Sequence, residues 1–272
     1  MSVKTVALIE SLERLCTETG RAAVAVSGGV DSVTLAVIAG RALGDDFTAC
    51  HAVSPAVPPL ATARVEAHAA RHGWRLEIVD AREFADPRYV ANPHDRCYFC
   101  KSNLYQRIAE VTSLPVFSGA NTDDLGDYRP GLRAAAEQQI RHPFVEVGAD
   151  KPDVRAMARR LGLDEVSELP AMPCLSSRVE SGIPIDAHDL TFVDAVEEQL
   201  RAALPGAENV RCRIVRQGVR VELDSKSLRY LESAAGASLR TEIEARCESE
   251  DRAFTGFSAY QRGSAFLVPG RA

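Results

Sequence analysis

The segment AAVAVSGGVDS, residues 22–32, joins a short apolar run to a glycine-rich turn. The run AAVAV has no polar residue, which is typical of a parallel strand that is buried on both faces. The residues that follow, 33–43, have the apolar spacing of a helix. The segment therefore predicts a strand, a tight turn and a helix, which is how an α/β unit begins.

The same alternation continues on both sides of this segment. Further strands are expected at 47–53, 75–79 and 115–118, and helices at 6–16, 62–72 and 98–111. Strands that alternate with helices form parallel sheets through right-handed crossovers. The predicted fold class is therefore α/β, with a doubly wound parallel sheet.

The pattern changes after residue 168. Residues 168–185 are rich in Pro, Ser and Gly, and loops of that length are often functional. Beyond it we expect helices at 190–204, 227–235 and 239–247, a hairpin over 210–223 and a strand at 254–260. The chain has 272 residues, and domains commonly have about 100–200. We predict two domains, 1–168 and a smaller α+β domain over 169–272.

The composition excludes several classes of protein. Apolar residues make up 46% and charged residues 26%, which is unlike collagen-like, disordered or disulfide-scaffold chains. The net charge of −6 and the lack of a basic stripe argue against a nucleic-acid partner. Residues 1–10 do not resemble a signal peptide, and no apolar run approaches the roughly 18 residues that span a membrane. We expect a cytoplasmic protein with no membrane partner.

The turn SGGVDS has the residues that an anion site needs. Two glycines let the backbone approach a ligand closely, and the N–H groups at a helix N-terminus bind anions. Asp31 is suited to Mg²⁺ or to capping the helix. The motif differs from the GxxxxGK[ST] loop of kinases and resembles the PP-loop of the ATP pyrophosphatase family, over residues 22–165. The resemblance implies ATP as a substrate, bound with Mg²⁺ on Asp31 and with contacts from Ser27, Gly28, Gly29, Val30 and Ser32.

Polar residues also follow the ends of later strands. Ser54 follows the second predicted strand, and Gly119, Asp124 and Arg129 follow the fourth. Ligands bind at the carboxyl edge of open parallel sheets, so we expect these residues to contact ATP or its metal. The alternative is an Asp-rich turn whose side chains cap helices.

Three of the seven cysteines form a candidate reactive set. Cys97 and Cys100 form a CxxC motif, and Cys174 lies in a later loop. Three thiolates can hold a 4Fe–4S cluster and leave one iron open, whereas electron-transfer clusters usually have four. A structural zinc with His94, and unrelated packed thiols, are the alternatives. The remaining cysteines are expected to be buried small hydrophobes; they are Cys16, Cys50, Cys212 and Cys247.

Four motifs together resemble the LarE family. They are SGGVDS, NPxxRCYxCK (92–101), GANxDDLGDYRPG (119–131) and PCLSSR (173–178). The resemblance implies an ATP-dependent sulfur transferase of nickel-pincer nucleotide cofactor biosynthesis. In that family the substrate, pyridinium-3,5-biscarboxylic acid mononucleotide, is adenylated, and sulfur then displaces AMP to give a thiocarboxylate.

The resemblance also implies where the sulfur comes from. Some members sacrifice the sulfur of the cysteine at the position of Cys174, which becomes dehydroalanine. Others hold a cluster at the positions of Cys97, Cys100 and Cys174, and this chain has all three. We therefore favour the cluster. The family further implies a homo-oligomer, a hexamer, although its C-terminal Gly-Tyr-x-Ser-Gly-Ser stretch reads AYQRGS here, at 259–264.

Several cationic residues are candidates for holding this nucleotide-like carboxylate. Arg211 and Arg213 lie two apart on a predicted strand and share one face, which suits a phosphate or carboxylate. A solvated strand face is the alternative. Lys101, Ser177 and Arg178 follow the reactive cysteines, and Glu198 and Glu222 are weaker candidates for a cation site.

Three other functions use a similar fold. A PP-loop tRNA thiolase can also use three cysteines, but the acidic chain lacks a basic arm. An amide-forming PP-loop synthetase has no use for these cysteines. A non-catalytic adenine-nucleotide sensor would not need an intact SGGVDS.

Overall fold

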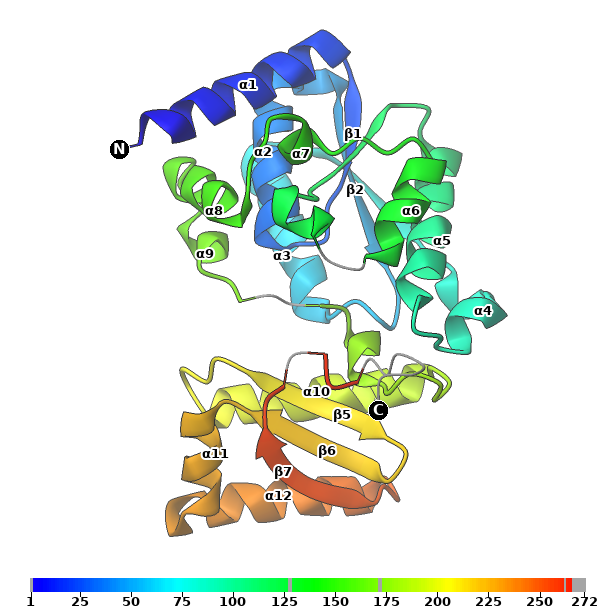
Figure 1. The fold of residues 1–272 in the computed structure, drawn as a ribbon, viewed down its shortest axis with the longest axis vertical. Helices are drawn as coiled ribbons and strands as arrows, with labels where there is room; N and C mark the ends of the chain where they lie inside the picture. The colour runs from blue at the N-terminus through cyan, green and yellow to red at the C-terminus, as the bar shows by residue number, and fades with distance from the viewer. Residues whose placement is uncertain (1, 127–128, 171–172, 262, 266–272) are drawn as a thin grey trace. The chain divides into compact units, whose positions relative to one another are not determined.

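The chain folds into two compact units in the computed structural model, which describes residues 2–126, 129–170, 173–261 and 263–265. The first unit comprises Met1–Asp86 and Asp95–Met172. The second comprises Pro87–His94 and Pro173–Ala272. Figure 1 shows the elements of both.

The first unit is built on a parallel four-stranded sheet in the order β3-β2-β1-β4. In chain order its strands are β1 (Ala22–Ala25), β2 (Phe47–Val53), β3 (Arg75–Asp80) and β4 (Val116–Ser118). The apolar run of β1 is buried because this strand lies between β2 and β4, with Val24 opposite Ala49 on one side and Phe117 on the other. The α/β class and the parallel sheet are thus confirmed.

Helices cover both faces of this sheet. They are α1 (Val3–Thr19), α2 (Val30–Leu43), α3 (Pro59–His72), α5 (Arg96–Val111), α6 (Pro130–Glu137), α7 (Pro143–Glu146), α8 (Lys151–Arg160) and α9 (Asp164–Ser167). Successive strand residues point to opposite faces. Val24 accordingly packs in one core with α1, α2 and α8, and Ala23 packs in another with α5. None of the described helices is long and apolar enough to cross a membrane.

The strand order creates a switch point beside β1. The chain runs outward from β1 to β2 and β3, and then returns to place β4 on the other side of β1. Ligands bind at the carboxyl edge of an open sheet at such a point. Gly119, just after β4, packs directly against the backbone of Asp31 and Ser32. A Cβ atom on Gly119 would lie 2.9 Å from both the Asp31 carbonyl carbon and the Ser32 nitrogen. The fold therefore brings the β4 loop against the SGGVDS turn.

The second unit has a mixed three-stranded sheet in the order β5-β6-β7. Strands β5 (Val210–Val215) and β6 (Gly218–Leu223) form an antiparallel hairpin, and β7 (Phe254–Ala259) pairs parallel to β6. Its helices are α4 (Pro87–Val90), α10 (Ala187–Ala203), α11 (Ser225–Glu232) and α12 (Ala237–Ser249). Helices α10 and α12 lie side by side, joined by a 3.2 Å hydrogen bond from Gln199 Nε2 to Glu242 Oε2. The predicted hairpin and α+β pattern are observed.

The segment Pro87–His94 belongs to the second unit although it precedes α5 of the first. Asn92 is fully buried and adopts a left-handed φ of 52°, which asparagine tolerates. Its side-chain amide donates to the carbonyls of Glu180 (2.9 Å) and Ile183 (2.8 Å). The Tyr89 hydroxyl lies 2.6 Å from Ser176 Oγ. These contacts fix the segment to the loop that carries Cys174.

Candidate functional site

The SGGVDS turn of the first unit is held open by its own serines. Ser32 Oγ accepts from the Ser27 N–H (3.1 Å), donates to the Gly29 carbonyl (3.1 Å) and lies 3.1 Å from Ser27 Oγ. Gly29 is the N-cap of α2 and has no side chain to occupy the first N–H groups of that helix. Those N–H groups and the positive end of the helix form a site suited to phosphate.

Helix α3 and strand β2 brace this turn from one side. Gly28 has a φ of 80°, and a Cβ on it would lie 2.8 Å from the Ala61 carbonyl oxygen, so no other residue fits without a shift. Arg64 Nη1 donates to the Gly28 carbonyl at 2.9 Å. The buried His51 bridges the Val26 carbonyl (2.8 Å) and Thr62 Oγ1 (2.9 Å). Burial lowers the pKa of His51, which favours its neutral form.

Asp31 has two polar partners in the first unit. Lys151 Nζ lies 2.5 Å from its Oδ2, and Asn121 Nδ2 donates to its Oδ1 at 3.1 Å. Neither partner was among the site residues expected from sequence. The sequence did offer a clue to Lys151. It is the first residue of α8, where the helix dipole disfavours a positive charge, so a lysine at this position calls for a nearby carboxylate.

The other residues expected to contact ATP, Ser54, Asp124 and Arg129, form local hydrogen bonds and an ion pair with neighbours in the chain. Ser54 follows β2 and accepts a hydrogen bond from the Ala56 N–H (3.2 Å). Asp124 accepts from the Asn121 N–H (3.0 Å) in a capping box and pairs with Arg129 (2.8 Å). The helix-cap alternative therefore describes Asp124. Asp127 and Tyr128 of the same motif lie outside the described residues.

Glu83 is a buried carboxylate that sequence reasoning missed. Burial raises its pKa, and a hydrogen bond with the Ser54 side chain opposes that shift. Its Oε2 is buried and has no hydrogen-bond partner in the described part of the chain. The residue lies in a short 3-10 turn after β3, and nothing in its sequence context distinguishes it from a surface glutamate.

The CxxC motif lies in the first turns of α5. Cys97 and Cys100 are half-buried, and their i, i+3 spacing places them on one face of the helix. Helix α6 packs beside them, with the Tyr98 hydroxyl donating to Glu137 Oε2 (2.6 Å) and the Arg133 guanidinium 3.9 Å from the Tyr98 ring centre. Lys101 Nζ lies 5.8 Å from the Tyr105 ring centre.

Burial separates the cysteines into two classes. Cys97 and Cys100 of the first unit and Cys174 of the second are half-buried. The other four are buried, as predicted; they are Cys16, Cys50, Cys212 and Cys247. Burial raises the pKa of Cys16 to about 11 and that of Cys50 to about 12, so both stay protonated thiols. Within the described ranges, no three His, Cys, Asp or Glu side chains come together as a metal site.

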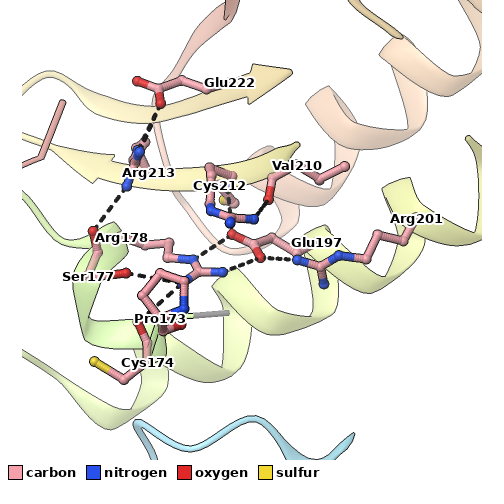
Figure 2. Close-up of polar contacts among 11 residues, drawn as sticks. Pro173, Cys174, Ser177, Arg178, Glu197, Arg201, Val210, Cys212, Arg213 and Glu222 are labelled. Atoms are coloured by element: carbon pink, nitrogen blue, oxygen red, sulfur yellow. Dashed lines mark hydrogen bonds and ion pairs between the residues drawn. The ribbon is translucent and has the colours of Figure 1, made fainter. Parts of the chain in front are cut away.

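A buried ion pair supports the loop of Cys174 in the second unit (Figure 2). Arg178 and Glu197 are almost fully buried and form two hydrogen bonds, of 2.8 and 2.9 Å. Arg178 Nη1 also donates to the carbonyls of Pro173 (2.6 Å) and Cys174 (3.2 Å) and to Ser177 Oγ (3.0 Å). Figure 2 shows the Cys174 sulfur pointing away from this guanidinium. Arg178 therefore binds the backbone of the loop and not the Cys174 thiol.

Arg211 and Arg213 share one face of β5, and both are buried, with 8% and 4% of their surfaces exposed. The solvated-face alternative is therefore excluded. Arg213 binds Glu222 (3.0 Å) and the Ser177 carbonyl (3.0 Å). Arg211 donates to the Val210 carbonyl (2.7 Å), and its pKa falls to about 10 because of burial and the neighbouring Arg178 charge. The planar guanidinium groups of these two arginines are suited to carboxylate and phosphate ligands.

The carboxylates near these arginines have cationic partners. Glu222 pairs with Arg213 and accepts a hydrogen bond from Ser264 Oγ (2.7 Å). Glu198 is exposed on α10, and it is the preceding residue, Glu197, that binds the arginines. Sequence reasoning missed Glu197 because helix rotation alone decides which of two neighbouring glutamates faces inward.

Comparison with known proteins places these residues in a family. The chain is 30% identical over 228 residues, 82% of this chain and 80% of the relative, to pyridinium-3,5-bisthiocarboxylic acid mononucleotide synthase of Lactiplantibacillus plantarum. The chain belongs to the LarE family. Other relatives are uncharacterized proteins: one of Synechocystis sp. is 39% identical over 81% of this chain and 82% of its own length. One of Methanocaldococcus jannaschii is 28% identical over 69% of this chain and 72% of its own length.

No family model matches the chain. The LarE assignment therefore stands on pairwise similarity, which covers most of both chains. It agrees with the resemblance carried by the four sequence motifs, two of which form the SGGVDS turn of the first unit and the Cys174 loop of the second.

Proposed function

We propose that this LarE-family protein is an ATP-dependent sulfur transferase that acts on pyridinium-3,5-biscarboxylic acid mononucleotide. The observation that carries the proposal is the similarity to an enzyme named for making the corresponding bisthiocarboxylic acid. The uncapped turn before α2 supports the use of a nucleoside triphosphate. The buried arginines of the second unit support a substrate that carries carboxylate and phosphate groups.

In the first half-reaction the substrate carboxylate is activated. A carboxylate oxygen attacks the α-phosphorus of ATP, the bond from that phosphorus to the bridging oxygen breaks, and pyrophosphate leaves. The N–H groups at the start of α2 bind the departing charge. Asp31 would hold Mg²⁺, which neutralises phosphate charge, and Lys151 at 2.5 Å supplies a second cation beside it. We assign the fold of this unit to the PP-loop superfamily on the same grounds.

In the second half-reaction sulfur replaces the adenylate. A sulfur nucleophile attacks the acyl carbon, the bond to the adenylate oxygen breaks, and AMP leaves with both electrons of that bond. We assign the binding of an anionic group of the substrate to Arg211 and Arg213, which share one buried face of β5. Arg178 and Ser177 keep the Cys174 loop in its conformation.

We propose that Cys97, Cys100 and Cys174 bind a 4Fe–4S cluster. These three are the half-buried cysteines, and Cys97 and Cys100 lie on one helix face, which suits two ligands of the same cluster. When bound, the cluster would supply sulfide as the nucleophile. If Cys174 is instead the donor, its Cβ–Sγ bond breaks with loss of the α-proton, and dehydroalanine remains.

The proposed first half-reaction, in which ATP activates the carboxylate, is tested by measuring the release of pyrophosphate. We expect Asp31→Ala to abolish substrate-dependent pyrophosphate release without loss of folding, because the variant loses the carboxylate that would hold Mg²⁺. Asp46→Ala, an exposed aspartate of the same unit, is the control and should retain wild-type release. Unchanged release by Asp31→Ala would refute the ATP site. Tight, salt-sensitive binding of tRNA would favour a tRNA thiolase instead.

The sulfur source is tested by metal analysis. We expect iron and acid-labile sulfide near the stoichiometry of one cluster after anaerobic purification, and their loss in Cys97→Ala. Cys50→Ala, which removes a buried thiol of the same unit, should keep both. A wild-type protein that stays free of iron after reconstitution would refute the cluster. Mass spectrometry after turnover would then be used to look for dehydroalanine at residue 174.

A further inference from the structure

Arg64 lies beside the SGGVDS turn and has no carboxylate partner in the described part of the chain. Its side chain is half-buried, and the guanidinium donates a 2.9 Å hydrogen bond to the Gly28 carbonyl. Burial lowers its pKa, and no anion among the described residues opposes this shift. The other cation at this turn differs, because Lys151 is neutralised by Asp31 at 2.5 Å.

The position of Arg64 is fixed by the packing of α3. Ala61 and Arg64 are three residues apart and therefore lie on one face of the helix. The Ala61 carbonyl limits residue 28 to glycine, and Thr62 is tied to His51 and through it to the Val26 carbonyl. The helix thus presents Arg64 to the turn through close backbone packing and two hydrogen bonds, not through a flexible surface chain.

We propose that Arg64 binds the terminal phosphates of ATP and the pyrophosphate product. The inference rests on the proposed function, since it assigns a further residue to that ATP site. A single hydrogen bond to Gly28 uses one of the five N–H groups of the guanidinium, and the fork geometry of the others suits phosphate oxygens. A bound triphosphate would supply the negative charge that the described residues around Arg64 do not.

The test is the affinity of purified protein for three probes, each with Mg²⁺: ATP, pyrophosphate and AMP. We expect Arg64→Gln to bind ATP and pyrophosphate about 10- to 100-fold more weakly, the usual loss for a charge-assisted hydrogen bond. AMP binding should change by less than about twofold, because AMP lacks the terminal phosphates. Arg64→Lys keeps the charge and should recover part of the loss.

A matched control is available on the same helix. Arg71 is exposed two turns further along α3 and pairs with Glu165, so Arg71→Gln should bind all three probes as the wild type does. Equal weakening of AMP and ATP by Arg64→Gln would mean that Arg64 only braces the turn, and would overturn the inference. No weakening would overturn it as well. A wild-type protein that binds neither ATP nor pyrophosphate would overturn the proposed function together with the inference.

Discussion

Glu197 is the residue on which the Cys174 loop depends. Its carboxylate accepts from Arg178 through both oxygens, from the Cys212 N–H (3.0 Å) and from Arg201 (2.5 Å). Burial raises the pKa of Glu197, but the Arg178 hydrogen bonds and the arginine charges together outweigh this effect. The net result is a lowered pKa, so the carboxylate stays ionised. A buried ion pair is stable only when both charges are satisfied in this way.

Replacing Glu197 with Gln should therefore destabilise the second unit. The change leaves the Arg178 guanidinium buried without a counter-charge, which costs about 3–5 kcal/mol in comparable sites. Urea denaturation, followed by circular dichroism, measures the free energy of unfolding. Glu198→Gln, on the adjacent exposed residue, should change it by less than about 0.5 kcal/mol. Equal stability of the two variants would contradict the structural role of Glu197.

At the scale of elements, α4 and the loop over 173–185 act as one piece. The loop is held by the side chains of Asn92 and Tyr89 and by backbone hydrogen bonds, among them one from the Ile185 N–H to the Val90 carbonyl (2.8 Å). A loop held by side-chain amides in this way loses its shape when the amide is removed, because buried carbonyls are left without donors.

Asn92→Gly should cost about 1–3 kcal/mol, since the carbonyls of Glu180 and Ile183 lose a buried donor while the left-handed φ stays allowed. Asn92→Ala should cost more, because alanine adds backbone strain at this φ. Limited proteolysis would show faster cleavage within 173–185 in both variants. Wild-type stability and cleavage in Asn92→Gly would show that the amide is dispensable.

At the scale of the whole molecule, buried and half-buried histidines should make the first unit sensitive to acid. Burial lowers the pKa of His51, His68, His72 and His142 below the ordinary value of 6.5. Below pH 6.5 the unfolded chain binds protons that the folded chain does not, so stability falls as the pH falls. The buried Glu83 affects stability in the opposite direction. Because its pKa is raised in the fold, its protonation at lower pH stabilises the folded state.

We expect the free energy of unfolding to fall between pH 7 and pH 5.5. Each histidine that stays neutral in the fold contributes up to about 1.4 kcal/mol per pH unit to this fall. Fluorescence of Trp74, the sole tryptophan, reports unfolding of the first unit. His51→Gln should reduce the pH slope, and His188→Gln, which replaces an exposed histidine, should leave it unchanged. An identical slope in wild type and His51→Gln would contradict the assignment.

Local patterns predicted much of this molecule. The apolar run of β1, the turn and the start of α2 could be placed from sequence because burial on both faces and glycine-dependent geometry are properties of adjacent residues. The bounds of β2 and of the β5–β6 hairpin followed from the same reasoning. The burial of Cys16 and Cys50 followed from their place in apolar patterns.

Long-range packing decided the rest. The order β3-β2-β1-β4, the transfer of Pro87–His94 to the second unit and the pairing of Lys151 with Asp31 all join residues that are far apart in sequence. The sequence by itself therefore determined the fold class, the glycine-rich turn between β1 and α2 and the family. Only the tertiary structure decided which charges meet. It pairs Arg178 with Glu197 and not with Glu198, and it leaves Arg64 beside the turn with no carboxylate partner among the described residues. The physical reason is that an ion pair depends on the rotation and packing of whole elements, which no local pattern specifies.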